Sequence, residues 1–241
     1  MNRRQSIDKK KARLDALRPL RAESIRSLME ALDVELVYSS NAVEGNTLTL
    51  QETSAVLLHG VTVAGKPLKD HLEAVHLASA WKRVKELAQT QGALTEHELL
   101  ELHTLVLGKD DPAAGHYRSV PVFIRGSKHV PPNALKVPDK MAELFAADRS
   151  HEHVVEQVAN IHEALVTIHP FVDGNGRTAR LVMNLLLMRS GFPPLRIQPE
   201  QRAAYFTALD ESRFGKREAF VEWIAALAET ELDFWLTHLE L

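Results

Sequence analysis

The sequence predicts an all-α protein. Apolar residues recur at helical spacing in nearly every segment, and capping boxes open two of these segments, "TLQE" at 49–52 and "TEHE" at 95–98. Only the segment 119–132 alternates like a strand. The chain has 241 residues, of which 45% are hydrophobic and 25% charged, and this suits one large helical domain.

The first half of the chain predicts four helices, each with an apolar stripe along one face. The second of them starts at Thr49, whose side chain can cap the amide of Glu52, and it ends near Gly60. The fourth starts at Thr95 and stops at Gly108. The stripes of the first and third helices consist of Ile25, Leu28, Met29, Leu32 and Leu36, and of Leu72, Val75, Ala78, Trp81 and Val84.

The second half predicts further helices. Pro138 suits the first turn of one of them. A longer apolar stripe over 154–168 ends at His169, because Pro170 disfavours helical geometry in the residue before it. A buried helix follows Gly176, and two more helices are predicted from Pro199 to about position 209 and from position 220 to the C-terminus.

The segment "SVPVFIRGSKHVPP" at 119–132 is the exception to helical spacing. Apolar and β-branched residues alternate around a glycine, which predicts a short β-hairpin. Pro121 can be accommodated only on an edge strand, since proline has no amide hydrogen to donate. An exposed edge of this kind can accept an added strand from another molecule.

Composition excludes several classes of protein. The chain has no cysteine, which excludes disulfide, thiolate-zinc and cysteine-nucleophile chemistry, and a cytoplasmic location is expected. No apolar run approaches the roughly 20 residues that span a bilayer, and no apolar signal core follows the basic start. The net charge of −3 gives no reason to expect nucleic-acid binding. Basic residues concentrate in the first 21 positions, which we interpret as a solvent-exposed arm or helix face.

The segment "IHPFVDGNGRTARL" at 168–181 combines groups that packing alone does not require. Gly174 and Gly176 allow a sharp turn that points main-chain amides at one place directly before a helix, and this arrangement is typical of an anion site. Arg177 and Arg180 share a face of the first helical turn, where two cations oppose the helix dipole. A polyanion such as a chain of phosphates would compensate them.

Two further side chains flank this predicted anion site. Asp173 is an acid beside an anion, and Mg²⁺ bridges such pairs by binding one or two carboxylates together with phosphates. His169 titrates near neutral pH and stands at the start of the loop, where it can act as a general base. Together these residues predict chemistry on a magnesium-bound phosphate compound.

Residues 169–180, HPFVDGNGRTAR, match the signature H-P-F-x-D/E-G-N-G-R-x-x-R of the Fic family at every fixed position. The segments "NAVEGNTLTLQE", "AGHYRSVPVFI" and "NLLLMRSGFPP" also resemble Fic sequences, so the resemblance covers about residues 35–235. It implies a Fic-type helical bundle in which the predicted hairpin is a flap near the active site. It also implies a protein adenylyltransferase that transfers AMP from Mg-ATP to a Ser, Thr or Tyr hydroxyl of a target protein.

The resemblance implies a role for each residue of the motif. His169 would deprotonate the target hydroxyl, and Asp173 would hold Mg²⁺. Tyr205 and Phe206 are candidates for stacking on the adenine, whereas Arg213 stands where the resemblance predicts an amide side chain. The implied nucleotide-binding residues are Gly174, Asn175, Gly176, Arg177, Arg180, Tyr205 and Phe206, with the side chain of Asn175 joining the main-chain amides. The implied target-binding residues of the flap are Val120, Val122, Phe123 and Ile124.

A second motif, "SSNAVEGN" at 39–46, resembles the Fic inhibitory pattern [S/T]-x-x-x-E-[G/N] through Ser40, Glu44 and Gly45. Ser40 and Glu44 are four residues apart and therefore share a face at the end of a helix. A carboxylate from this helix could pair with Arg180 and deny that arginine to the γ-phosphate of ATP. The sequence therefore predicts an autoinhibited enzyme of the class with an N-terminal inhibitory helix.

These motifs also predict how the chain is organised. Residues 1–50 form an N-terminal helical segment with the inhibitory motif, and residues 51–241 form a single compact catalytic core. Two alternative functions stay open, a non-catalytic regulator that senses ATP and an enzyme that removes AMP by means of Glu44. The expected partners are ATP and a target protein, which includes the chain itself, and apolar N-terminal helix faces allow a homodimer. No membrane or nucleic acid is expected as a partner.

Overall fold

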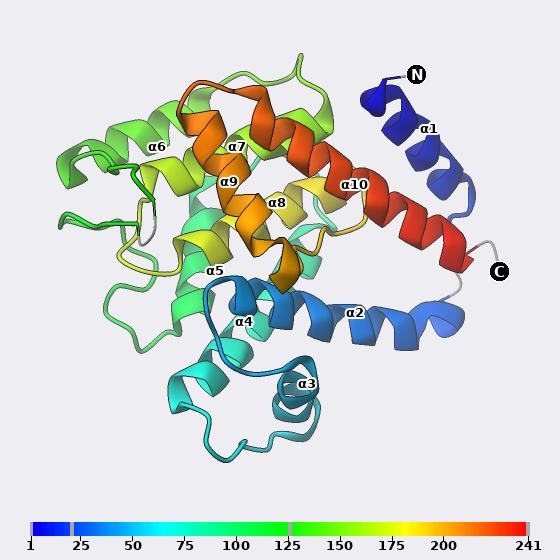
Figure 1. Cartoon of the computed structure of the whole chain (residues 1–241), viewed down its shortest axis with the longest axis horizontal. Coiled ribbons are helices and arrows are strands. Elements are labelled where there is room, and N and C mark those ends of the chain that lie inside the picture. The colour runs from blue at the N-terminus through cyan, green and yellow to red at the C-terminus, as the bar shows by residue number, and fades with distance from the viewer. Residues whose placement is uncertain (1, 20–21, 125–126, 240–241) are drawn as a thin grey trace.

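The structure is a computed structural model that describes residues 2–19, 22–124 and 127–239. Within these ranges it contains ten α-helices, two short 3-10 helices and no strand (Figure 1). The predicted all-α class is therefore confirmed. The α-helices are α1 (Arg3–Ala16), α2 (Ala22–Val43), α3 (Leu50–His59), α4 (Leu68–Leu87), α5 (Glu96–Leu107), α6 (Val137–Ala146), α7 (Val154–Ile168), α8 (Asn175–Arg189), α9 (Arg202–Arg213) and α10 (Glu218–Leu239). The 3-10 helices are η1 (Ala134–Lys136) and η2 (Pro199–Gln201).

Helix α8 lies at the centre of the fold. Eleven of its 15 residues are buried, and it packs against α7, α5, α4 and α2. Helix α10 packs on α7 and α9 and so encloses the other side of α7 (Figure 1). The segment that carries the signature connects α7 to α8, so both of its ends are fixed in a packed core.

Helix α2 belongs to the same core. Leu32 and Leu36 of its predicted stripe are buried there, whereas the side chain of Ile25 lies outside the described part of the chain. No helix in the described ranges is both long and apolar enough to cross a membrane.

Several helix ends form where the sequence predicts them. Thr49 and Thr95 accept hydrogen bonds from the amides of Glu52 and Glu98 in two complete capping boxes, so α3 and α5 begin as predicted. Gly60 caps the end of α3 with a left-handed φ of 64°. Local capping chemistry therefore determines these boundaries.

The buried face of α4 matches only part of the predicted stripe, of which Trp81 and Val84 are buried in the core. The predicted stripe includes Leu72 and Val75, but their side chains are 46% and 44% exposed. The face that packs against α2, α5 and α8 carries Ala74, Leu77 and Trp81, none of which is more than 3% exposed. Both stripes have helical spacing, and the close packing of small alanine residues against the neighbouring helices decides between them.

The predicted β-hairpin at 119–132 is wrong for the part of that segment that the structure describes. Residues 119–124 and 127–132 form no strand, and the predicted turn at 125–126 lies outside the described residues. The amide of Ser127 donates to the carbonyl of Ile124 at 3.2 Å, which joins the two parts without a ladder of paired strands.

Proline and one arginine account for the missing strands. Three prolines within 119–132 have no amide hydrogen for a ladder. The guanidinium of Arg118 also donates hydrogen bonds to the carbonyls of Val120 and Pro132, near the two ends of the segment. The main-chain acceptors that a hairpin would pair with each other are therefore bound by a side chain.

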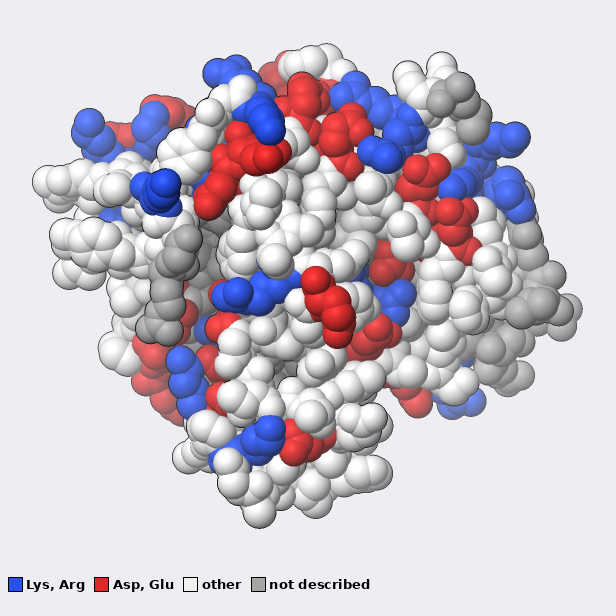
Figure 2. All heavy atoms as spheres, in the orientation of Figure 1, with Lys and Arg blue, Asp and Glu red and all other residues white. Residues whose placement is uncertain are grey.

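Helix α1 lies against α10 at one edge of the molecule (Figure 1). Its basic side chains pair with acids of α10, as in Arg3 with Glu222 at 2.8 Å and Lys10 with Asp233 at 2.7 Å. Blue and red groups adjoin along this contact in Figure 2. The basic start of the chain is thus a helix whose charged face is partly engaged in ion pairs.

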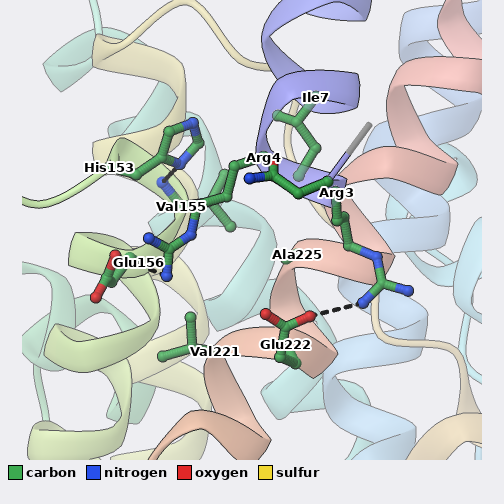
Figure 3. A pocket seen from close by; sticks show the side chains of 10 residues that line it. Arg3, Arg4, Ile7, His153, Val155, Glu156, Val221, Glu222 and Ala225 are labelled. Atoms are coloured by element: carbon green, nitrogen blue, oxygen red, sulfur yellow. Dashed lines mark hydrogen bonds and ion pairs between the residues drawn. The ribbon is translucent and has the colours of Figure 1, made fainter.

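A cavity of about 390 Å³ lies beside the N-terminal end of α1, between α7 and α10 (Figure 3). Apolar side chains from all three helices line it, among them Ile7, Val155 and Val221, and the pair of Arg3 with Glu222 lies at its rim. None of the predicted site residues lines this cavity, so it is separate from the candidate active site.

Candidate active site

His169 ends helix α7 in an uncommon main-chain conformation. Its φ of 52° is left-handed, and its amide donates to the carbonyl of Leu165. The ring nitrogen Nδ1 lies 3.2 Å from the carbonyl oxygen of Val166, which can only accept, so Nδ1 carries the proton and Nε2 is the basic atom. Burial lowers the pKa of His169 below its usual value, which keeps the ring neutral near pH 7.

Asn175 determines the shape of the loop after His169. Its Oδ1 accepts from the amide of Phe171 and its Nδ2 donates to the carbonyl of Phe171, both at 2.9 Å. The residue is 5% exposed, so these bonds lie in the interior. The side chain was predicted to reach a phosphate, but in this structure both ends of its amide hold the loop.

His103 on α5 supports the same loop, a role for which the sequence gives no signal. Its ring stacks on Phe171 with 3.6 Å between the centroids. Its Nδ1 accepts from the amide of Gly115 and its Nε2 donates to the carbonyl of Asp173, each at 3.0 Å. Burial lowers the pKa of His103 to about 4, so the ring is neutral and a single tautomer makes both bonds.

The first turn of α8 has the features of an anion site. Gly174 precedes it with a φ of 74°, which favours glycine. The first amides of an α-helix lack partners within the helix and lie at the positive end of its dipole. A Cβ added to Gly176 would overlap Oε1 of Glu44, so a carboxylate already lies against this turn.

Arg180 is buried and is held by residues at the end of α2. Its Nε donates to Ser40 Oγ at 2.9 Å, and its Nη2 lies 2.8 Å from both the Ser40 carbonyl and Glu44 Oε1, so the predicted pair of Glu44 with Arg180 is present. Burial alone would lower the pKa of Arg180, but the Glu44 carboxylate outweighs burial and raises it. Nη1 is buried and has no hydrogen-bond partner among the described residues, which leaves a donor for a further acceptor.

Arg177 also faces carboxylates. Its Nη1 lies 3.4 Å from Glu73 on α4, and its Nη2 lies 3.6 Å from Asp173. The Asp173 side chain is 62% exposed, and its Oδ1 accepts from the amide of Gly174 at 2.6 Å. Glu73 was not predicted, because nothing in the sequence relates it to the motif.

The two predicted adenine-stacking residues, Tyr205 and Phe206, differ in how deeply they are buried. Tyr205 is 1% exposed, and its ring packs among those of His162, Phe206 and other aromatic residues of the core. Burial raises its pKa to about 12. Core packing therefore surrounds the ring of Tyr205 in this structure, and its stacking on a base stays a prediction. Phe206 is half-buried, and the guanidinium of Arg202 lies 5.0 Å from its ring centre.

Two arginines to which the sequence assigned no role in positioning reach the end of α7. Arg213 donates from Nε to Thr167 Oγ1 at 3.0 Å. Arg118 donates from Nε to the carbonyl of His169 at 2.8 Å. Both bonds join segments that are far apart in sequence, so no spacing pattern could reveal them.

The predicted target-binding residues keep an exposed apolar surface next to this site, although they form no strand. Phe123 is 85% exposed and Val120 is 49% exposed, whereas Val122 and Ile124 are half-buried. Arg118 links Val120 to the turn at His169, because it donates to the carbonyls of both residues.

Comparisons with known proteins agree with this arrangement. Residues 93–187 match the model of the Fic/DOC family. The protein adenylyltransferase Fic of Nematostella vectensis is 38% identical over 96% of the chain and 56% of its own length, and that of Drosophila grimshawi is 37% identical over 96% of the chain and 48% of its own length. The chain thus spans about half the length of these curated relatives.

Solved structures resemble the whole fold. A Fic domain containing signaling protein from Bacteroides thetaiotaomicron superposes with a TM-score of 0.88 at 27% identity, over 98% of this chain and 97% of its own. A fragment of Fic-1 from C. elegans superposes with a TM-score of 0.86 at 31% identity, over 98% of this chain and 72% of the fragment. With the complete signature between α7 and α8, these likenesses show that the chain belongs to the Fic family.

Proposed function

We propose that this chain transfers AMP from ATP to a hydroxyl group of a target protein. One observation carries the proposal. The loop between α7 and α8 begins at His169, whose ring is neutral and whose Nε2 is unprotonated. It ends at the N-terminus of α8, where Arg177 and Arg180 are buried. These are a base and an anion site on one rigid loop. The relatives from Nematostella and Drosophila are called protein adenylyltransferases, which supports the same activity.

The reaction uses each group once. Nε2 of His169 takes the proton from the target hydroxyl as its oxygen forms a bond to the α-phosphorus of ATP. The bond from that phosphorus to the bridging oxygen breaks, and pyrophosphate leaves. The amides of the first turn of α8 and the guanidinium groups of Arg177 and Arg180 bind the phosphate oxygens. A positioned base contributes roughly 10²–10⁴-fold to the rate.

The donor set at Asp173 fits a magnesium ion that arrives with the nucleotide. A single exposed carboxylate is a poor site alone, but Mg²⁺ binds through one or two carboxylates together with substrate phosphates. When bound, the ion neutralises charge on the phosphates. Asp173 would hold it, and the bond of its Oδ1 to the Gly174 amide orients the carboxylate.

The target would bind over residues 119–132, beside the turn at His169. Phe123 and Val130 are 85% and 71% exposed, and together with Val120 they offer apolar contacts without a deep pocket. Exposed apolar side chains of this kind mark surfaces for protein contact.

Glu44 and Ser40 would keep the enzyme inactive. The phosphate chain of ATP must reach Arg180, whose Nε and Nη2 are occupied by Ser40 and Glu44. Glu44 also lies against Gly176 at the start of α8, where a phosphate would meet a like charge. A misfit of only ~2.7 kcal/mol would reduce productive ATP binding ~100-fold.

Transfer of label from ATP carrying a radioactive α-phosphate tests both parts of the proposal. Glu44→Gly should label itself or a lysate protein more strongly than the wild type, and adding His169→Ala should abolish this gain. Glu30→Gln, which changes an exposed acid of the same helix, is the matched control and should behave as the wild type. Persistent labelling by the His169→Ala variant would rule out His169 as the base.

The same assay separates the alternative functions. A regulator that only senses ATP would bind nucleotide but transfer nothing in the Glu44→Gly background. An enzyme that removes AMP would release it from a labelled target only when Glu44 is present. The neutral Nε2 of His169 favours transfer, since a sensor has no use for a base.

A further inference from the structure

Arg118 is a buried arginine whose guanidinium binds main-chain carbonyls. It is 4% exposed. Its Nε donates to the carbonyl of His169 at 2.8 Å, its Nη1 to that of Val120 at 3.0 Å, and its Nη2 to that of Pro132 at 2.6 Å. Nη2 also lies 3.5 Å from the carbonyl of Ile168. All three nitrogens of the fork are therefore used.

The acceptors belong to two segments that act in the same reaction. Ile168 and His169 form the turn that presents the base, and the main-chain amide of Arg118 adds a bond to the carbonyl of Pro170 at 2.9 Å. Val120 and Pro132 lie near the start and at the end of the segment 119–132. One residue thus fixes both ends of the target-binding segment to the turn that carries the base.

The turn needs such support. His169 has a left-handed φ of 52°, which side chains other than glycine adopt at a cost, so that the surrounding structure must hold it. Through its guanidinium and its main-chain amide, Arg118 contacts the carbonyls of three consecutive residues of this turn, Ile168, His169 and Pro170. The segment 119–132 has no paired strands in its described part, so side-chain bonds hold it: those of Arg118 near its two ends, and those of Ser127 to Asp210 and of His129 to the carbonyl of Thr167 between them.

An arginine is required by geometry rather than by charge. Its five N–H groups lie in one plane and point in fixed directions, so it can donate to carbonyls of both segments at once, whereas lysine has a single nitrogen at the end of a flexible chain. Burial lowers the pKa of Arg118, which is consistent with a guanidinium whose acceptors are neutral carbonyls.

We propose that Arg118 is a positioning residue that couples the target-binding segment 119–132 to the catalytic turn at His169. The proposal rests on the proposed AMP transfer, in which the target hydroxyl must meet Nε2 of His169. Because one guanidinium holds both segments, a shift of either displaces the hydroxyl from the base. A displacement of about 1 Å can cost on the order of 100-fold in rate.

The first test compares Arg118→Lys with Arg196→Lys, both in the Glu44→Gly background. Arg196 is a buried arginine away from the loop, paired with Glu35 and Glu231, so its replacement controls for the loss of a buried guanidinium. We expect Arg118→Lys to lower kcat/KM for the target on the order of 100-fold and to leave the dissociation constant of ATP unchanged. Equal effects of both variants on transfer would overturn the proposal.

Hydrogen exchange gives a readout that does not depend on transfer. Arg118→Lys should speed exchange of the hydrogen-bonded amides of Ser127, His129 and His169, while α8 stays protected. Arg196→Lys should leave these amides as in the wild type. If exchange in Arg118→Lys is unchanged, the coupling is refuted, whether or not the protein transfers AMP. Faster exchange in Arg118→Lys would support the coupling even if the chain had no transfer activity.

The wild type supplies the test if Arg118→Lys does not fold. Under mild denaturant, the hydrogen-bonded amides of Ser127, His129 and His169 should exchange through one opening, with the same free energy and the same dependence on denaturant. Separate openings with different free energies would show that the two segments move independently and would overturn the proposal.

Discussion

Two buried histidines lie in the core beneath the candidate site. His103 stacks on Phe171 and bonds to the main chain on both sides of its ring. His162 is fully buried, with its Nε2 at 3.2 Å from the hydroxyl of Tyr205, and burial lowers its pKa to about 3. In the unfolded chain both rings titrate at about 6.5. Both are therefore neutral in the folded protein at pH values where the unfolded chain protonates them.

This difference predicts a loss of stability in mild acid. Below about pH 6.5 the unfolded chain binds protons that the folded chain excludes, so the free energy of unfolding falls as the pH falls towards the lowered pKa. Between pH 6.5 and 5 the loss is roughly 2 kcal/mol for each histidine. His103→Gln, which keeps a donor and an acceptor but does not titrate, should show a smaller loss in urea unfolding at pH 7 and pH 5.

The exposed His59 offers the matched control. His59→Gln should lose as much stability between these pH values as the wild type does. If His103→Gln loses that much too, the neutral His103 ring does not contribute to the acid sensitivity.

Residues of the motif could be predicted because they adjoin one another in sequence. His169, Asp173 and Arg180 occur within twelve positions, and each type of group has a recognisable use beside a phosphate. His103 and Arg118 could not be predicted, because they act on main-chain atoms 70 and 51 positions away. Every residue has a carbonyl, so the sequence around the acceptor does not indicate which distant side chain binds it.

At the scale of helices, α1 is attached by two buried apolar side chains and by a set of ion pairs. Ile7 and Leu14 are its buried apolar side chains, and its ion pairs reach α10 and α7, as in Arg4 with Glu156 at 3.1 Å. The Arg4 and Glu156 side chains are 45% and 22% exposed, and partly exposed pairs of this kind contribute about 0–1 kcal/mol each. The docking of α1 should therefore respond to salt.

Salt should loosen α1 before it affects the core. At 1 M salt the Debye length falls to about 3 Å, so the pairs between α1 and α10 are largely screened. We expect hydrogen exchange over residues 3–16 to accelerate about tenfold between 50 mM and 1 M NaCl, corresponding to ~1.4 kcal/mol, while α8 is unchanged. Lys10→Glu at low salt should have the same effect, since Lys10 pairs with Glu229 and Asp233. Equal exchange of α1 at both salt concentrations would mean that Ile7 and Leu14 suffice to hold it.

Helix boundaries could be predicted from the sequence better than helix faces or strands. Thr49 and Thr95 define their helices through bonds made within four residues. The buried face of α4 depends instead on which neighbours pack against Ala74 and Leu77, and apolar spacing alone does not contain this information. The hairpin at 119–132 was wrong for a similar reason, because Arg118 supplies from outside the segment the bonds that a partner strand would have made.

At the scale of the whole molecule, one of the contacts between the two predicted parts of the chain joins the inhibitory motif to helix α8. Ser40 and Glu44 lie at the end of α2, and Arg180 lies on α8, 140 residues from Ser40. Helix α2 also contributes apolar side chains to the common core, so the position of Glu44 is fixed by packing along the helix. Movement of the carboxylate away from Arg180 therefore requires a change at the end of α2, which makes this contact suited to regulation.

Replacement of Glu44 should lower the stability of the free protein but increase the stabilisation that Mg-ATP provides. Without nucleotide, Glu44→Gly leaves the buried Arg180 without its counter-charge, which costs about 1–3 kcal/mol and lowers the melting temperature. With Mg-ATP the variant should be stabilised more than the wild type, because a ~100-fold lower Kd adds up to ~2.7 kcal/mol at saturation. Thermal unfolding with and without Mg-ATP measures both effects, and Glu30→Gln should show neither. If Glu44→Gly melts like the wild type and gains no more from Mg-ATP, the Glu44 carboxylate does not compete with the phosphates for Arg180.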